Sequence, residues 1–168
     1  MGSCERGVKD DRDETPDERA DRNMAELLQE LRVALPGVQV LFAFLLTVPF
    51  AQGFQSVSDF QRNVYLVTLL ASACASAFFI SPTAYHRLNF RRRDKEHIVE
   101  VSSRLTLLGI ASLAVAMTGA ILLVTDYLFR DATTVVVTVG VGLLLATMWA
   151  FLPMLRRRKT DKRDAVQD

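Results

Sequence analysis

Residues 33–58, VALPGVQVLFAFLLTVPFAQGFQSVS, carry no charged side chain. Three further runs, residues 63–85, 105–125 and 132–155, are equally free of Asp, Glu, Lys and Arg. The four runs are 26, 23, 21 and 24 residues long, and about 20 apolar residues are needed to cross a bilayer as a helix. A soluble protein of 168 residues has no interior that could bury four such helices. The sequence therefore predicts an all-α fold, a transmembrane four-helix bundle.

The basic residues around these runs predict the orientation of the protein. Eighteen of the 20 Lys and Arg residues lie ahead of the first run, between the second and third runs, or after the fourth. The two remaining loops hold one each, Arg62 and Arg130. Because Lys and Arg concentrate in cytoplasmic loops, we expect both termini and the central loop in the cytoplasm. A cleaved signal peptide is the rival interpretation of the first run, but the 32 highly charged residues ahead of it argue against one.

The predicted transmembrane domain covers residues 36-155, with spans at about 36-54, 64-82, 105-125 and 132-153 and a basic cytoplasmic loop at 83-104. Ahead of this loop, Ser81-Pro82 is expected to end or kink the second helix. The apolar residues from Ile98 onward predict that the third span extends as a helix below the membrane. Residues 1-14 are dense in charge and almost free of apolar side chains, so we expect a disordered cytoplasmic tail. Residues 156-168 form a second tail, which is basic and polar.

Residues 15-35 carry the signals of a cytoplasmic amphipathic helix. Thr15 is a suitable N-cap, Pro16 fits the first helical position, and Glu18 completes a capping box. Proline disfavours helix in the residue before it and suits the first turn of the helix that follows, so we expect a break between two helices at Pro36. The apolar face of the predicted helix consists of residues at helical spacing: Met24, Leu27, Leu28, Leu31 and Leu35.

The partner of this helix is open between the lipid surface, the central loop and another chain. Helices that lie on membranes are usually rich in Lys and Arg on the polar face, whereas this one has more carboxylates than basic groups. Its carboxylates suit the basic cluster of the central loop, so a contact within the chain or between subunits is preferred. That cluster, a candidate contact for a partner or for lipid headgroups, is Arg91, Arg92 and Arg93.

Each span has a stripe of small or polar residues at four-residue spacing, the pattern by which membrane helices approach one another closely. The stripes are Gln39, Ala43, Thr47 and Ala51 in the first span; Ala73, Ala77 and Ser81 in the second; Ser112, Ala116 and Ala120, beside Gly109 and Gly119, in the third; and Thr138, Gly142, Ala146 and Ala150 in the fourth. Four stripes together predict a close-packed bundle, in which Gln39 would form hydrogen bonds between helices near the cytoplasmic surface.

The spans hold few groups that could carry chemistry. No charged residue lies within them, and Asp59, Asp126 and Asp131 lie at the outer edge, where water can reach them. A metal site at His86 and His97 would normally need further ligands close in space, and Cys4 and Cys74 are not expected to reach them. We therefore expect no catalytic, cofactor or metal site, no enzyme activity and no nucleic-acid partner. The remaining candidates are polar side chains within the spans: Gln39, Thr47, Ser81, Ser112 and Thr138.

Four segments carry a resemblance to a family: Glu14-Thr15, RNMAELLQELRVALPGVQVLFAFLLTVPF (22–50), FQRNVYLVTLL (60–70) and SPTAYHRLNFR (81–91), together with the hairpin at Asp126. They resemble uncharacterised four-span membrane proteins from actinobacteria, a domain of unknown function. The resemblance implies a bacterial plasma-membrane protein and supplies no established activity. Some relatives look to have received a sodium/proton antiporter label by automated naming, and the lack of a buried carboxylate in the spans gives that label no physical support.

Two classes of function stay open at this point. The preferred one is a non-enzymatic accessory or scaffold protein of the membrane, which associates through helix packing as a homo-oligomer or with a larger membrane protein. The alternative is a small ion-coupled transporter or channel-like protein that works as an oligomer, with the polar residues of the spans along its path. An enzyme acting on lipid headgroups is the least favoured class, since it would need His86, Arg87 and the basic cluster to bind substrate.

Overall fold

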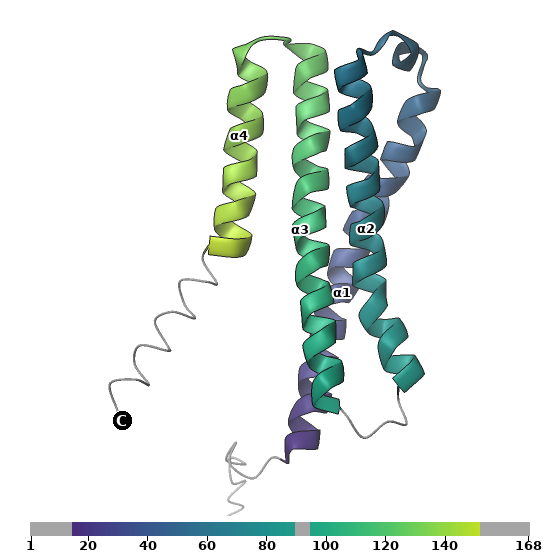
Figure 1. The fold of residues 1–168 in the computed structure, drawn as a ribbon, viewed down its shortest axis with the longest axis vertical. Helices are drawn as coiled ribbons and strands as arrows, with labels where there is room; N and C mark the ends of the chain where they lie inside the picture. The colour runs from purple at the N-terminus through teal and green to yellow at the C-terminus, as the bar shows by residue number, and fades with distance from the viewer. Residues whose placement is uncertain (1–14, 90–94, 152–168) are drawn as a thin grey trace, which may run out of the picture.

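A computed structural model describes residues 15–89 and 95–151. The long helices are α1 (Pro16–Thr47), α2 (Asp59–Asn89), α3 (Lys95–Leu128) and α4 (Ala132–Ala146). Short turns η2 (Val48–Phe50) and η3 (Gln52–Ser56) follow α1, and a π-helical turn η4 (Thr147–Phe151) follows α4 (Figure 1). These residues form helices and no strands, so the predicted all-α class is confirmed. The predicted tails at 1-14 and 156-168 lie outside the described residues.

Four helical segments are long and apolar enough to cross a membrane. They are residues 21–50, 59–85, 98–128 and 132–149, and each contains most of one predicted span. The two helical hairpins, α1 with α2 and α3 with α4, are connected at the same end of the molecule, at the top of Figure 1. We call this the hairpin end, and the opposite end, where α1 begins and α2 ends, the terminal end.

The start of α1 forms as predicted. The Thr15 side chain accepts a hydrogen bond from the Glu18 backbone N–H, and the Glu18 carboxylate accepts one from the Thr15 N–H at 3.0 Å. This capping box satisfies backbone donors that the first turn of a helix leaves without partners.

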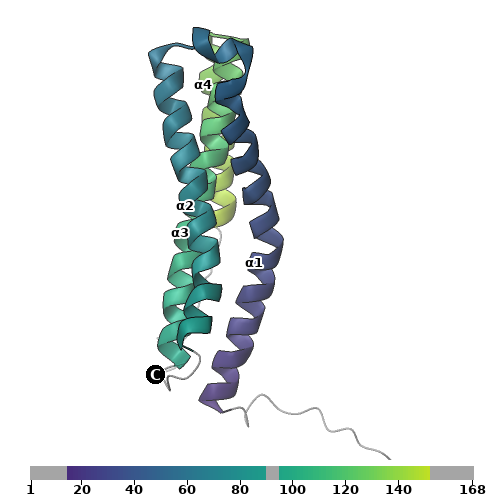
Figure 2. The ribbon, with the colours of Figure 1, turned by 90° about the vertical axis from the view of Figure 1, so that its right-hand side faces the viewer.

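The predicted break at Pro36 is wrong, because α1 runs without interruption from Pro16 to Thr47. Proline within a helix removes one backbone hydrogen bond and costs about 3 kcal/mol. Packing offsets this cost, because the buried face of α1 continues across Pro36. Its buried residues follow one another every seven positions: Met24, Leu31, Val38 and Leu45. Pro36 itself is exposed, so its ring displaces no neighbouring helix. The amphipathic segment and the first span are one rod, which bows away from α2 and α3 in Figure 2.

The predicted loop at 83-104 is largely helical. Helix α2 continues past the buried Pro82 to Asn89, so Ser81-Pro82 does not end it, and the last turns of α2 swing away from α3 (Figure 1). Helix α3 already begins at Lys95, which confirms the helical extension expected around Ile98. The described parts of the second and third spans therefore reach well beyond the predicted limits at the terminal end.

Helices α2 and α3 form the central pair and lie side by side over most of their length (Figures 1 and 2). The Phe79 ring packs against Gly109, and the Thr68 side chain packs against Gly119, so two glycines of α3 admit two larger side chains of α2. The buried residues of α2 recur at intervals of alternately four and three residues, the spacing of a left-handed coiled coil. They are Gln61, Tyr65, Thr68, Ser72, Ala75, Phe79 and Pro82.

Helix α1 packs against both members of this pair near the middle of the molecule. Leu31 and Val38 of α1 form one buried cluster with Ala75 and Phe79 of α2. Ile110 and Leu113 of α3 pack against the cluster from the third side. This cluster is the main hydrophobic core among the described residues.

Helix α4 is peripheral and packs mainly on α3 (Figure 1). Thr134 is its one buried residue between Ala132 and Ala146. The predicted stripe of α4 does face α3, since a Cβ on Gly142 would lie 3.6 Å from the Thr118 side chain. The four helices are therefore a packed group of three, α1 to α3, with a fourth helix beside α3.

Candidate functional site

Gln39 does not lie between helices of the same chain. It is exposed on α1, and so are the other members of its stripe, Ala43, Thr47 and Ala51. The buried neighbour Val38, with 0% exposure, occupies the inward face instead. The interpretation of Gln39 as an interhelical hydrogen-bonding group within the chain is therefore wrong. In lipid an exposed amide and a row of small residues form a surface on which a further helix could pack closely.

The other stripes divide between inner and outer positions. Ala116 of α3 is fully buried, with Ser112 and Ala120 partly buried beside it, as predicted. In α2 the predicted stripe lies to one side of the buried face, because Ala77 is exposed while Ser72 and Ala75 are buried. Sequence spacing alone did not separate these faces.

The five polar candidates of the spans are not brought onto one path. Gln39 and Thr47 lie on the exposed side of α1. Thr47 donates to the Phe44 carbonyl at 2.7 Å and Ser81 donates to the Ala77 carbonyl at 2.8 Å, so both hydroxyls bond to their own helices. Ser112 is partly buried on α3, and the buried Thr138 hydroxyl of α4 has no hydrogen-bond partner within the described chain.

Two buried hydroxyls of α2, those of Thr68 and Ser72, are also satisfied within their own helix. Thr68 donates to the Val64 carbonyl at 2.7 Å, and Ser72 donates to the Leu69 carbonyl at 2.9 Å. Because these groups need no partner across the interface, they serve as small side chains that let α2 approach α3.

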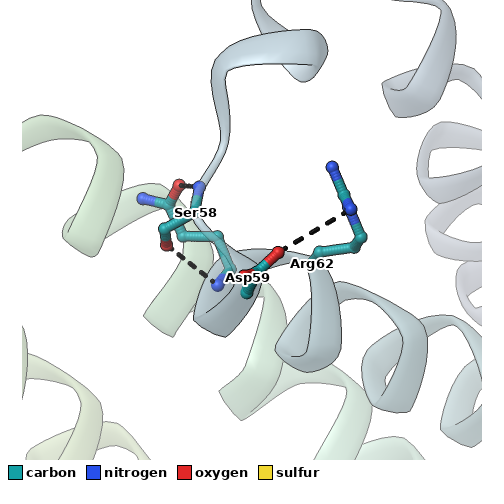
Figure 3. Close-up of polar contacts among 4 residues, drawn as sticks. Ser58, Asp59 and Arg62 are labelled. Carbon is teal, nitrogen blue, oxygen red and sulfur yellow. Dashed lines mark hydrogen bonds and ion pairs between the residues drawn. The ribbon is translucent and has the colours of Figure 1, made fainter.

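A cluster of polar contacts, which the sequence analysis did not foresee, lies at the hairpin end. Gln61 and Ser58 form a capping box at the start of α2: the Gln61 Oε1 accepts from the Ser58 N–H at 3.0 Å, and the Ser58 Oγ accepts from the Gln61 N–H at 3.2 Å (Figure 3). The Gln61 Nε2 also donates to the Asp126 carboxylate of α3 at 2.8 Å. Gln61 is 5% exposed, so one buried amide both caps α2 and connects it to α3.

Charged side chains near this cluster remain in contact with solvent. Asp59 and Arg62 form an ion pair with an N–O distance of 3.7 Å, and both side chains are well exposed (Figure 3). An exposed pair of this kind contributes little to stability. Of the three aspartates at this end, Asp126 is the one held by a buried partner, and Asp131 caps α4 by accepting from the Thr133 N–H at 2.8 Å.

Tyr65 connects α2 to α1 at a defect that proline creates. Pro49 has no N–H, so the Leu45 carbonyl loses the donor that a regular helix would supply four residues later. The Tyr65 hydroxyl donates to that carbonyl at 2.8 Å, beside a shorter-range bond from the Val48 N–H. Neighbouring helices commonly satisfy backbone groups that proline releases in membranes. The Ser58-to-Gln61 signal was present in the sequence, whereas the pairing of Tyr65 with Pro49 depends on helix packing.

A cavity of about 550 Å³, which we call the hairpin-end pocket, lies beside these contacts. Its walls come from α1, the η2–η3 segment, α2 and α3. The buried side chains Leu45, Gln61 and Tyr65 lie at its floor, and exposed side chains of α1 and α3, including Phe44 and Val124, lie at its rim. The lining is almost entirely apolar.

No group of three or more potential metal ligands occurs within the described residues, 15–89 and 95–151. The basic cluster Arg91, Arg92 and Arg93, the candidate for headgroup or partner contact, lies outside them.

A model of a family of unknown function, DUF6328, matches residues 13–153. The chain belongs to this family. No curated protein and no solved structure matches the chain.

The DUF6328 match covers all four helices and every contact described above. The expectation of a domain of unknown function is therefore confirmed. The family description assigns no activity.

Proposed function

We propose that this protein is a non-enzymatic component of the membrane that acts by associating through helix faces, either with further copies of itself or with a larger membrane protein. The observation that carries the proposal is the position of Gln39. Its amide lies on the exposed side of α1, within the charge-free run 33–58 of a segment apolar enough to span a membrane. Lipid tails offer an amide no hydrogen-bond partner, whereas a neighbouring helix can offer one.

The peripheral place of α4 supports the same proposal. Helix α4 packs mainly on α3, and its other faces carry large exposed apolar side chains such as Val136, Leu143 and Leu144. Lipid can cover these faces of α4. The outer faces of α4 and the exposed side of α1 are also two surfaces that are open to other helices. We further propose, from the resemblance of the sequence, a bacterial plasma-membrane protein of actinobacterial type. Its proposed orientation, with both termini in the cytoplasm, is supported by the distribution of Lys and Arg.

The proposal can be tested by measuring self-association in liposomes. Förster transfer between two labelled pools of the protein, at several protein-to-lipid ratios, reports the dissociation constant. The variant Gln39→Leu should weaken association by roughly 3- to 20-fold, the range for hydrogen bonds between membrane helices. The control Gln29→Leu makes the same change at an exposed position of the same helix, two to three turns nearer the terminal end, and should leave association unchanged.

Association with a larger partner would require a second measurement. If the protein stays monomeric at every ratio and crosslinking at native expression captures no partner, the association proposal fails.

The ion-coupled alternative gains no support from the arrangement of the polar residues, since Gln39 and Thr47 lie on the exposed side of α1, away from the helix packing. Ion flux into proteoliposomes that is abolished by both Gln39→Leu and Asp126→Asn would revive it.

A further inference from the structure

The hairpin-end pocket opens sideways rather than toward the connecting loops. At the loop end a Cβ on Gly53 would lie 3.5 Å from the Tyr127 hydroxyl, so the η3 turn and the last turn of α3 meet there. Exposed rim residues come from α1 and α3, with Phe44 68% and Val124 59% exposed. Because both helices are apolar enough to span a membrane, the opening between them faces the region that lipid tails would occupy.

The polar atoms at the floor of the pocket already have protein partners. The Gln61 amide is used by Ser58 and Asp126, and the Tyr65 hydroxyl donates to the Leu45 carbonyl. A ligand group with several hydrogen-bonding atoms would therefore lose its own partners on entering the pocket. The interior favours a molecule, or a part of one, that carries no polar atoms.

The dimensions fit a narrow chain. The lining runs from Leu41 of α1 to Val48 at the start of η2, and from Ala120 to Leu128 on α3, which at 1.5 Å per residue is roughly 10–12 Å of helix. A volume of about 550 Å³ falls within the range of roughly 300–1,000 Å³ for pockets that hold small ligands. Ala120 contributes a short side chain to the α3 wall, which leaves room for an occupant.

From these observations we propose that the hairpin-end pocket binds one aliphatic chain of a membrane lipid, which enters between α1 and α3. The chain moves from one apolar surrounding to another, so burial from water contributes little, and close packing against the lining distinguishes the site from the surrounding lipid. We expect the hairpin-end pocket to retain a lipid tail for longer than the rest of the protein surface does. The proposal does not depend on association of the protein with other chains.

Photolabelling of the full-length protein in nanodiscs tests this site. The nanodiscs contain phosphatidylglycerol with a small fraction of the same lipid carrying a diazirine at the end of one acyl chain. After irradiation, peptide mapping should find label on Leu45 and Leu123 of the pocket several-fold above that on Leu143 and Leu144, which are exposed on α4.

A pair of variants separates the pocket from general lipid contact. Val124→Trp places an indole at the rim and should reduce the pocket label several-fold, whereas Val136→Trp, at an α4 residue that is 70% exposed, should not. Both positions are exposed, so thermal unfolding of the two variants should match that of the parent protein. Even labelling of the pocket and of α4, or pocket label unaffected by Val124→Trp, would mean annular lipid only and overturn the proposal.

Discussion

Replacing Gly109 with alanine should weaken the contact between α2 and α3 on which the other helices rest. A Cβ at position 109 would lie 2.5, 2.6 and 3.2 Å from three carbons of the Phe79 ring. Carbon atoms pack best at about 3.5–4.0 Å, so the ring would have to retreat by about 1 Å. The ring is 1% exposed and sits within the buried cluster with Leu31, Val38 and Ala75, so it has no free space to enter. Overpacking of this kind typically costs about 1–3 kcal/mol.

Helix propensity acts in the opposite direction and has to be subtracted. Alanine is better than glycine in a helix by about 1 kcal/mol, so the net effect of Gly109→Ala is a smaller loss. Gly140→Ala is the matched control, because it makes the same change in α4 where nothing lies within 4 Å of the new Cβ. The propensity gain is shared, so the difference in the free energy of unfolding between the two variants should be about 1–3 kcal/mol.

Reversible unfolding in mixed micelles, with the denaturing detergent raised in steps and helix content followed by circular dichroism, measures this difference. Phe79→Leu removes the ring. In that background the difference in the free energy of unfolding between Gly109→Ala and Gly140→Ala should therefore shrink, as a double-mutant cycle would record. If Gly109→Ala and Gly140→Ala change stability equally, the close packing of Phe79 on Gly109 does not hold the helices together and the reasoning is refuted.

Three further changes test separate contacts by the same unfolding measurement. Tyr65→Phe removes the donor to the Leu45 carbonyl and should cost about 0.6 kcal/mol, the average for such bonds in membranes. In a Pro49→Ala background, where residue 49 regains its N–H, the cost should be smaller, and an equal cost in both backgrounds would argue against the pairing. Arg130 has a left-handed φ of 51° between α3 and α4, so Arg130→Gly should stabilise by up to about 1 kcal/mol; a loss of stability would contradict this. Thr15→Ala removes the cap of α1 and should cost about 1 kcal/mol, with Thr133→Ala, an exposed residue whose side chain caps nothing, as the comparison.

Local signals in the sequence predicted the elements well where the signal acts within one turn or one span. Four uncharged runs predicted four helices, because the length needed to cross a bilayer is set by the bilayer. The capping box at Thr15 formed as expected, since its two hydrogen bonds involve residues three apart. The same logic would have found the second capping box, at Ser58 and Gln61, which the sequence analysis overlooked.

Predictions about faces and breaks were less successful for a physical reason. In a membrane helix the lipid-facing side is as apolar as the packed side, so hydrophobic periodicity does not reveal which side is buried. The stripe of Gln39 and the stripe of Ala116 look alike in sequence, yet the first is exposed and the second is buried. The break at Pro36 did not form, because the buried positions on both sides of it continue one face.

The sequence by itself determined that this protein has four apolar helices, where most of them lie along the chain, and how the first one begins, because bilayer thickness and helix capping act on consecutive residues. The tertiary structure decided that α1 is one rod, that Gln39 is exposed, that α4 lies beside α3, and that the Tyr65 hydroxyl donates to the Leu45 carbonyl, to which Pro49 has no N–H to donate. Those features depend on which surfaces meet across residues far apart in the chain, and packing chooses among surfaces that the sequence makes almost equally apolar.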